Sequence, residues 1–428
     1  MSIEMTTLSN GLRVVTQDMA HLETVSLGVW VGTGARSESA SQHGVSHLLE
    51  HMAFKGTARR SAREIAEEIE SAGGELNAAT SLETTAYYAR VLKTDIPLAI
   101  DIIADIVRDP KFDTVELARE KDVIFQEIAA AEDSPDDVAH DLAQQAAFPG
   151  QPLGRPILGT RESVRQFTPD DLSAYMKSHY TPGSMVLAAA GAADHEVLAG
   201  LAEDAFGDME QSDPHVPEPA NYKGGFMRSD RSYEQSHIVV SFEGPSYRVD
   251  DMYTGQVLSS VLGGGMSSRL FQEARETRGL CYSIYSYCWG LSDSGLFGIH
   301  AATGPEQVPE LAELILRELD KLANGFVGDA ELSRAKAQLK SGLLISLESS
   351  GSRAEQVARQ TLAFGAPRDI GVLVEKVESV DKEAVRALAG KLTMSTAPSV
   401  SAVGPVQDED ALERLILGQY PRPIRAAE

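Results

Sequence analysis

Three side chains suited to metal chemistry lie within five residues of one another near the start of the chain. His47, Glu50 and His51 form the pattern H-x-x-E-H. On an α-helix, positions i, i+3 and i+4 share one face, so two imidazoles and a carboxylate converge on one point. Neutral imidazoles are good zinc ligands, and a neighbouring carboxylate can take a proton from water at the metal. The pattern predicts a hydrolytic zinc site, and a chance cluster on a solvated helix is the alternative.

A catalytic zinc site also needs a third protein ligand, which this pattern does not supply. The residues Asp113-Thr114-Val115-Glu116 are typical of a helix N-terminus and predict a helix over 113–132. That helix carries Glu120 and Glu127, seven residues apart, on nearly the same face and about 10 Å apart along the axis. From spacing alone, either carboxylate is a candidate for the third ligand.

An internal repeat bears on both carboxylates. The segment Glu116-Leu117-Ala118-Arg119-Glu120-Lys121 resembles Glu331-Leu332-Ser333-Arg334-Ala335-Lys336, which lies 215 positions later. At this offset Glu120 corresponds to Ala335 and Glu127 to Gly342, and the second half has no H-x-x-E-H. Both carboxylates are therefore absent from the copy that lacks the histidines. Loss of one metal site after a duplication would leave this pattern.

Hydrophobic periodicity predicts the elements that position these residues. In the first half it predicts strands at 12–17, 25–32, 76–80, 84–91 and 185–191, the metal helix ending at Gly56, and helices at 61–72, 94–108, 113–132, 137–147, 170–178 and 194–206. In the second half it predicts strands at 236–243, 281–290, 294–302 and 398–403, and helices at 252–262, 305–323, 329–348, 353–362 and 382–392.

These patterns predict an α+β fold of two homologous α/β-sandwich halves related by duplication. Each half is expected to hold a mixed or antiparallel sheet with helices packed on it. The zinc-binding catalytic half is predicted at 1–210, and a Pro- and Gly-rich linker at 211–227. A second half without the metal site is predicted at 228–428.

The composition restricts the partners and the location of the protein. The chain has 428 residues and a net charge of -25 at pH 7, which disfavours nucleic acid and favours cationic partners. Two cysteines are too few for a disulfide framework or a Cys-rich zinc site. No secretory signal pattern and no membrane-spanning apolar run is found in the sequence. We therefore expect a cytoplasmic protein without a membrane partner.

Four further motifs accompany the metal pattern. They are Asn10-Gly11-Leu12-Arg13-Val14, Gly73-Gly74-Glu75-Leu76-Asn77-Ala78-Ala79-Thr80, Gly263-Gly264-Gly265-Met266-Ser267-Ser268-Arg269-Leu270-Phe271 and Arg275-Glu276-Thr277-Arg278-Gly279-Leu280-Cys281-Tyr282. Glu127 also follows His51 by 76 residues. On these motifs, essentially the whole chain resembles the pitrilysin or insulin-degrading-enzyme superfamily of inverzincin metallopeptidases. Within it, the chain is most similar to the short bacterial branch that resembles the mitochondrial processing peptidase.

The resemblance implies roles for the metal-site residues. His47, His51 and Glu127 would hold one Zn²⁺ per chain, which resolves the choice that spacing left open. Glu50 would deprotonate the attacking water and pass the proton to the leaving amine. Glu120 would support the site as a second carboxylate behind the ligands.

The resemblance also implies residues that handle the substrate. Asn77 and Ala78 match an edge strand on which the family lays its peptide as an added β-strand. Arg275 and Tyr282 match a pair whose donors steady the substrate carbonyl and its developing oxyanion. Without the resemblance, Asn77 would be interpreted as a turn residue, Arg275 as helix surface and Tyr282 as strand core.

In the family, the Arg/Tyr pair lies on a half that opposes the zinc half across a closed chamber. A chain with two halves forms half of such a clamshell, so the resemblance implies that Arg275 and Tyr282 reach the zinc site from a second subunit. A homodimer is preferred because this chain has its own pair. A heterodimer with a related chain is the alternative.

The function that follows is a zinc-dependent endopeptidase that cleaves oligopeptides or unfolded segments, basic peptides included, inside a dimeric chamber. The alternative is a non-catalytic or partner-dependent subunit of a heterodimeric complex similar to the processing peptidase. One feature departs from that relative, whose non-catalytic subunit has a long glycine-rich loop for presequences. Only Gly263-Gly264-Gly265-Met266 stands here, so presequence specificity is not implied.

Overall fold

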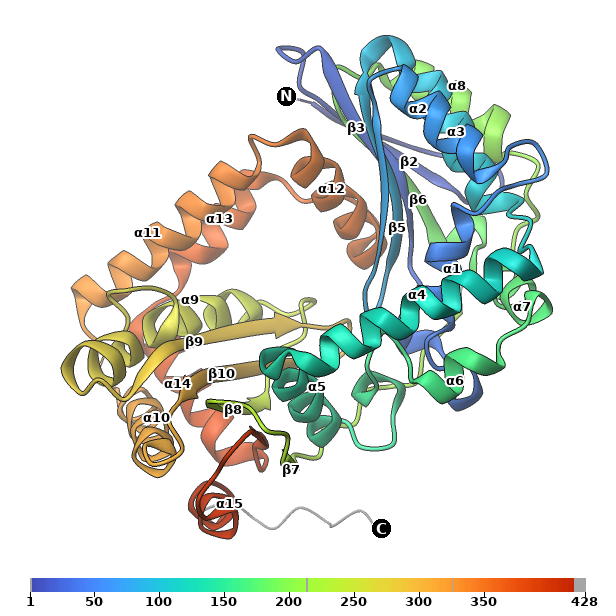
Figure 1. Ribbon diagram of the computed structural model, residues 1–428. Coiled ribbons are helices and arrows are strands. Elements are labelled where there is room, and N and C mark those ends of the chain that lie inside the picture. The colour runs from blue at the N-terminus through green and yellow to red at the C-terminus, as the bar shows by residue number, and fades with distance from the viewer. Residues whose placement is uncertain (1, 213–214, 326, 419–428) are drawn as a thin grey trace. The chain divides into compact units, whose positions relative to one another are not determined.

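Two mixed sheets form the framework of the chain (Figure 1). The structure, a computed structural model, describes residues 2–212, 215–325 and 327–418. The first sheet has the strand order β1-β2-β6-β3-β5-β4. Its strands are β1 (Ile3–Thr7), β2 (Arg13–Asp18), β3 (Thr24–Val31), β4 (Glu75–Thr80), β5 (Thr85–Leu92) and β6 (Met185–Gly191). The second sheet has the order β7-β11-β8-β10-β9. Its strands are β7 (Gly225–Ser229), β8 (Ser236–Glu243), β9 (Cys281–Gly290), β10 (Gly295–Thr303) and β11 (Ser399–Val403).

The two sheets have the same topology apart from β1. Strands β2, β6, β3, β5 and β4 match β7, β11, β8, β10 and β9 in spatial order. The pair β2/β6 is parallel, as is β7/β11, and the remaining pairs of both sheets are antiparallel. This agreement confirms the predicted α+β fold of two similar halves.

The described residues also form α-helices, which are joined to one another and to the strands by connecting segments. They are α1 (Val45–Ala53), α2 (Ala62–Ser71), α3 (Ile96–Arg108), α4 (Thr114–Asp133), α5 (Pro135–Ala147), α6 (Arg161–Gln166), α7 (Pro169–His179), α8 (His195–Phe206), α9 (Asp251–Gly263), α10 (Val308–Ala323), α11 (Asp329–Ser346), α12 (Ser350–Phe364), α13 (Ile370–Ser379), α14 (Lys382–Ser395) and α15 (Glu409–Leu417). A π-helical segment spans Phe271–Thr277. No helix of the described residues is both long and apolar enough to cross a membrane.

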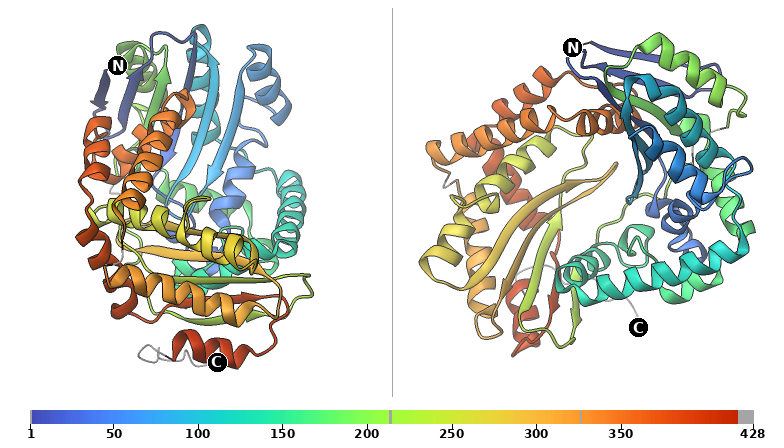
Figure 2. Two further views of the ribbon diagram at one scale, coloured as in Figure 1. Left: turned by 90° about the vertical axis from the view of Figure 1, so that its left-hand side faces the viewer. Right: turned by 45° about the horizontal axis from the view of Figure 1, so that its top comes forward.

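The chain forms two compact units, and each takes one helix from the other half of the sequence. One unit comprises Met1–Ala129, Pro156–Glu218 and Leu344–Arg368, and the other comprises Ala130–Arg155, Pro219–Leu343 and Asp369–Glu428. Helix α12 packs on β2, β3 and β6 of the first sheet, whereas α5 packs on β7, β8 and β11 of the second. Figure 2 shows both sheets from two further directions. The helices α5 and α12 begin 215 positions apart, so they are equivalent in the repeat.

The first sheet is buried on both faces near its centre. Ala354, Val357 and Ala358 of α12 pack with Trp30 and Val186 on one face. The other face contributes to a larger apolar core with α1, α3 and α8. Every residue of β6 is buried, as expected for a central strand with helices on both faces. This double cover makes the sheet a rigid base for α1.

The sequence-based element assignment missed β1, β7, α6, α13 and α15. These are short, and five to ten residues carry too little periodicity for a firm assignment. Strand β7 begins at Gly225, inside the segment predicted as a linker. The predicted end of the metal helix at Gly56 is wrong, because α1 ends at Ala53 and Gly56 lies in the following turn with φ 111°. The division into halves at 1–210 and 228–428 stays a prediction.

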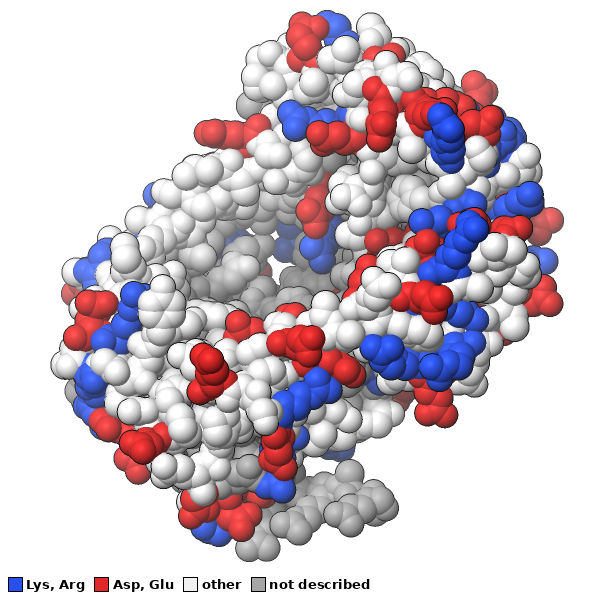
Figure 3. All heavy atoms as spheres, viewed as in Figure 1, with Lys and Arg blue, Asp and Glu red and all other residues white. Residues whose placement is uncertain are grey.

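Charged side chains are distributed over the surface of the chain. On the face drawn in Figure 3, Asp and Glu side chains alternate with Lys and Arg and do not gather into one patch. The net charge of -25 therefore does not by itself mark a binding surface on this face.

Candidate active site

Helix α1 is anchored at its N-terminus by a buried carboxylate. Glu38 is 1% exposed and accepts hydrogen bonds from the backbone N–H groups of Gly44 and Ser46, each 2.8 Å long. These are donors that a helix start leaves without partners, and a negative charge there is favourable. Gly44 has φ 90°, and a Cβ would lie 2.8 Å from the Cα of Gly159. Sequence reasoning missed Glu38, because nothing in its spacing indicates a cap.

The two histidines of α1 converge with Glu127 of α4. Oε2 of Glu127 lies 3.5 Å from Nε2 of His47 and 3.6 Å from Nε2 of His51. One ligand atom from each of the three residues lies within 4.8 Å of the others. Ligands of a tetrahedral zinc ion with bonds of about 2.0–2.1 Å are about 3.3 Å apart. The three side chains therefore fit a zinc ion with little movement.

His47 is in the protonation state that metal binding needs. Burial, with a smaller contribution from neighbouring His51, lowers the pKa of His47 to about 4. His47 is therefore neutral at pH 7, and a neutral imidazole offers a lone pair to a metal. The rings of His47 and His51 lie edge to face, with centroids 4.7 Å apart.

Glu120 lies behind the histidines. Nδ1 of His51 donates a hydrogen bond of 3.0 Å to Oε2 of Glu120, and Lys55 contacts the other carboxylate oxygen at 2.7 Å. Glu120 is only 5% exposed. The bond fixes the tautomer of His51 so that Nε2 is the atom facing Glu127. Glu120 and Glu127, which spacing left as equal candidates, thus contact opposite nitrogens of one imidazole.

Glu50 is held beside the histidines by the first sheet. It is half-buried, and the hydroxyl of Thr80, the last residue of β4, donates a hydrogen bond to its Oε2. Burial raises the pKa of Glu50, and the bond from Thr80 opposes this rise only in part. A raised pKa makes a carboxylate a better proton acceptor at neutral pH. Thr80 was missed as a contact, although it ends the Gly73–Thr80 motif.

The predicted substrate residues Asn77 and Ala78 lie on the edge of the first sheet. Strand β4 pairs with β5 on one side and is the outermost strand. Asn77 is exposed, and its side-chain oxygen accepts a hydrogen bond of 2.9 Å from the N–H of Ala78. An exposed edge with backbone groups not paired to another strand is able to accept an added strand.

Arg275 and Tyr282 lie in the second unit and contact each other. Arg275 is on the π-helical segment, with its guanidinium carbon 5.0 Å from the centre of the Tyr282 ring and 4.7 Å from that of Phe271. Tyr282 is in β9 and is 76% exposed. The alternative interpretation of Tyr282 as strand core is therefore wrong, because its side chain faces solvent.

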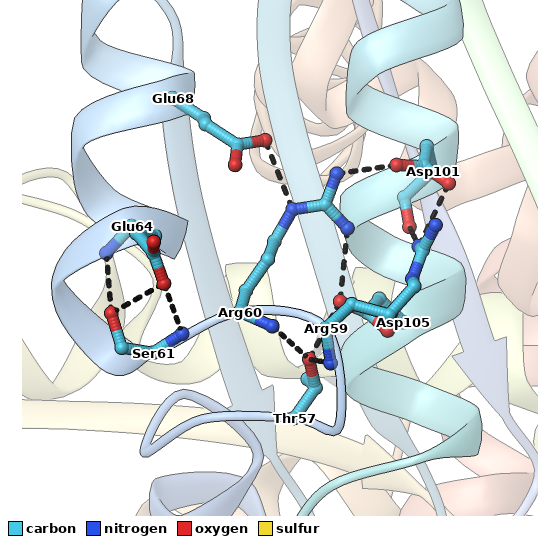
Figure 4. A network of polar contacts seen from close by, with 8 residues as sticks. All are labelled: Thr57, Arg59, Arg60, Ser61, Glu64, Glu68, Asp101 and Asp105. Carbon is cyan, nitrogen blue, oxygen red and sulfur yellow. Dashed lines mark hydrogen bonds and ion pairs between the residues drawn. The ribbon is translucent and has the colours of Figure 1, made fainter.

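The turn after α1 is tied to α3 by a polar network (Figure 4). Asp105, 3% exposed, accepts hydrogen bonds from the Thr57 hydroxyl at 2.7 Å, Arg60 at 2.9 Å and Arg59 at 3.0 Å. Burial alone would raise the pKa of Asp105, but these bonds outweigh it, and the pKa is lowered. Ser61 and Glu64 then form a capping box that starts α2. The network holds the C-terminal end of α1 against the core.

Comparison with known proteins identifies the family. Residues 13–161 match the family model described as insulinase, peptidase family M16, and residues 166–339 match the model of the M16 inactive domain. Over 419 residues the chain is 37% identical to an uncharacterized zinc protease of Streptomyces coelicolor, covering 96% of this chain and 91% of that protein. The chain belongs to peptidase family M16. It is thus a zinc protease, as its motifs predicted.

Further relatives agree with this assignment. A zinc protease of Bacillus subtilis is 39% identical over 90% of this chain and 94% of its own length. The crystal structure of a protease from Helicobacter pylori matches the fold with a TM-score of 0.87 and 21% identity, over 94% of this chain and 99% of that one. The M16 inactive domain begins after the H-x-x-E-H motif and Glu127. Zinc is the cofactor, and His47, His51 and Glu127 are its candidate site.

Proposed function

We propose that this M16 protease is an endopeptidase for oligopeptides and unfolded segments, with Glu50 as its general base. The observation that carries the proposal is the meeting of His47, His51 and Glu127 beside a half-buried carboxylate on the same helix. Such a set suits hydrolysis by activated water better than structural metal binding, because a structural zinc site has four protein ligands.

The residues around the metal divide the chemistry among themselves. Zn²⁺, when bound, polarises the scissile carbonyl and lowers the pKa of water toward about 7. Glu50 accepts the proton of the attacking water and then gives it to the leaving amine. Thr80 holds one oxygen of Glu50, so the other remains to face the water. Glu120 keeps His51 in the tautomer that presents Nε2 to the metal.

The edge strand β4 supplies the binding surface for the peptide. The N–H of Ala78 donates a hydrogen bond to the side-chain oxygen of Asn77. A peptide laid antiparallel or parallel along β4 can take over this donor, and the Asn77 amide is then free to bind the peptide backbone. Because these hydrogen bonds are made to the backbone of the peptide, the surface requires an extended substrate and depends little on the side chains of the peptide. Flexible peptides should therefore be cleaved and folded proteins spared.

We infer further that Arg275 and Tyr282 complete the site from a second subunit. Their contact with each other and the exposure of Tyr282 leave a cationic group and a phenol on one surface. Both can donate to an oxyanion that develops on the substrate carbonyl. A homodimer then contains two equivalent sites, each with donors from both chains.

A random peptide pool tests the reaction. We expect the zinc-loaded protein to cut peptides at internal bonds, with products identified by mass spectrometry, and a chelator to stop cleavage until zinc is returned. Because the net charge of the chain is -25, we expect lysine- and arginine-containing peptides among the preferred substrates. Trimming of single residues from peptide ends, or no cleavage by zinc-loaded protein, would contradict the proposal.

Mixed dimers test the shared site. Glu50→Gln chains and Arg275→Ala chains, carrying different tags, are mixed and the doubly tagged dimers isolated. One of the two sites in each mixed dimer then has an intact Glu50 and an intact Arg275, so activity is expected to rise well above that of either parent. A monomeric wild-type protein, or isolated mixed dimers as inactive as their parents, would exclude the arrangement.

A further inference from the structure

A second trio of metal-ligating side chains is found among the described residues, in the second unit. Oδ1 of Asp136, on α5, lies 2.9 Å from Nδ1 of His237 and 2.8 Å from Nε2 of His300. The ligand atoms of the three residues lie within 4.8 Å of one another. Two imidazoles and one carboxylate form a donor set that suits Zn²⁺ and other borderline divalent ions.

The sheet brings the two histidines to one face. In the antiparallel pair β8/β10, His300 is opposite Val239, and His237 is opposite Ala302. His237 and His300 therefore stand two positions apart along neighbouring strands and point to the same side. Helix α5 covers this side through Ala139 and Ala143, which pack with Val239. Asp136 lies one turn before His140, at the first turn of the helix.

His300 is the least expected member of the trio. Its side chain is 1% exposed, yet neither ring nitrogen makes a hydrogen bond with any described residue. Asp136 is close to Nε2, but the contact lacks hydrogen-bond geometry. Oδ1 of Asp136 thus lies near Nε2 of His300 without accepting a hydrogen bond from it. Two ligand atoms of one metal ion lie beside each other in this way. Without an ion, a buried imidazole that has no hydrogen-bond partner destabilises the fold.

The surroundings favour a cation. His140 is bonded to the Tyr285 hydroxyl at 2.9 Å and stacks beside His300, which restricts the position of the His300 ring. The Asp136 side chain is 57% exposed. Water can therefore reach the trio and fill a fourth position of a tetrahedral ion.

We propose that Asp136, His237 and His300 form a second divalent metal site, for Zn²⁺ or a similar ion, that fastens α5 to β8 and β10. The three ligands come from a helix of the first sequence half and two strands of the second. An ion bound to all three links the exchanged helix to its sheet. The distances of 2.8 and 2.9 Å must lengthen to about 3.3 Å to admit zinc, and the exposed Asp136 side chain is able to move that far.

Metal stoichiometry and thermal melting test this site without relying on activity. Metal-free wild-type protein titrated with Zn²⁺ should bind two equivalents per chain, and a His47→Ala/His51→Ala variant should bind one. In that background, saturating Zn²⁺ is expected to raise Tm by about 5 °C. Co²⁺ titrated into the same variant should give the visible absorption of a nitrogen- and oxygen-ligated ion.

Conservative variants locate the second ion. Asp136→Asn, made in the His47→Ala/His51→Ala variant, keeps the shape of an exposed side chain. It should abolish binding of the one Zn²⁺ equivalent that this variant retains, together with the rise in Tm. Asp137→Asn, an exposed neighbour on the same helix, is the matched control and should leave both unchanged. The proposal is overturned if the wild type binds one equivalent of Zn²⁺ and the His47→Ala/His51→Ala variant binds none. It is also overturned if the Asp136→Asn and Asp137→Asn variants bind Zn²⁺ equally.

Discussion

The two halves of the chain share a framework and differ in chemistry. Helices α4 and α11 begin 215 positions apart and share two buried positions, Leu117 with Leu332 and Glu120 with Ala335. The Glu120 carboxylate, which accepts a hydrogen bond from His51, is replaced by the methyl group of Ala335 in the second half. The helix continues to pack in both cases. Topology and part of the burial pattern are thus retained, while the polar residues of the site are exchanged.

The helices that follow β3 and β8 differ in the same way. Helix α1 carries His47, Glu50 and His51 on one face, whereas α9 has no histidine and buries Val257, Leu258, Val261 and Leu262. Apolar residues there contribute to the core without any polar partner. The comparison indicates that the metal site is supported by a few polar contacts added to a framework that the second half forms without them.

The largest effect should follow removal of the general base in the first half. Glu50→Gln keeps the size and the Thr80 contact of the side chain but cannot take a proton. We expect kcat to fall about 10²–10⁴-fold with the zinc content unchanged, measured by peptide cleavage and elemental analysis. Glu67→Gln, an exposed carboxylate of α2 paired with Arg63, is the control. A zinc-loaded Glu50→Gln protein with near wild-type turnover would refute the assignment.

A smaller effect is expected when the first half receives the residue of the second. Glu120→Ala places the Ala335 equivalent behind His51 and leaves Lys55 without its buried partner. Zinc affinity should fall about 10–100-fold, because His51 loses the bond that orients it. Competition with a chromophoric chelator measures this. Glu116→Gln, on the same helix but partly exposed, is expected to bind zinc normally; equal affinity in the two variants would deny Glu120 a positioning role.

The network behind α1 should contribute stability that depends on pH. Asp105→Asn is expected to lower the free energy of unfolding by about 2 kcal/mol at pH 7, because buried bonds to Thr57, Arg59 and Arg60 weaken. The folded-state pKa of Asp105 is lowered, so its stabilisation is present above the unfolded pKa, about 3.9. It is lost as pH falls through the lower folded pKa. Denaturant unfolding from pH 7 to pH 3 should show the difference from wild type shrinking; a constant difference would argue against an ionised Asp105.

The smallest expected effect is on stability, at a position that carries glutamate in both halves, Glu116 and Glu331. Glu331 of α11 pairs with Arg269 through two contacts of 2.6 and 2.9 Å, with both side chains largely buried. Its counterpart Glu116 pairs with the exposed Arg119. Glu331→Gln should cost about 1 kcal/mol and Glu116→Gln about 0.3 kcal/mol in unfolding experiments. The reverse order would show that burial of the pair does not govern its contribution.

Much of the site could be predicted because its signals are local. A helical spacing of three and four residues places His47, Glu50 and His51 on one face whatever surrounds them. The repeat drew attention to Glu120 and Glu127, and the family resemblance distinguished them. Strands such as β8, at Ser236–Glu243, were predicted with correct bounds because alternation is strong there. These patterns depend only on neighbours in the sequence.

The rest depends on contacts between distant segments. Glu38 caps α1, Thr80 holds Glu50, and His300 meets Asp136 over 164 residues. Nothing in the sequence near each residue indicates its partner. The same is true of the crossing of α5 and α12 to the sheets of the opposite halves.

The sequence by itself determined that this chain is a duplicated α+β protein with one H-x-x-E-H zinc motif and a distant glutamate to complete it. Periodicity reports which face of an element is buried, and motif spacing reports which side chains share a face. Only the tertiary structure decided which nitrogen each carboxylate contacts, which helix covers which sheet, and that Asp136, His237 and His300 meet. Those pairings are set by the packing of whole elements, because burial favours any apolar partner of suitable shape and does not name one.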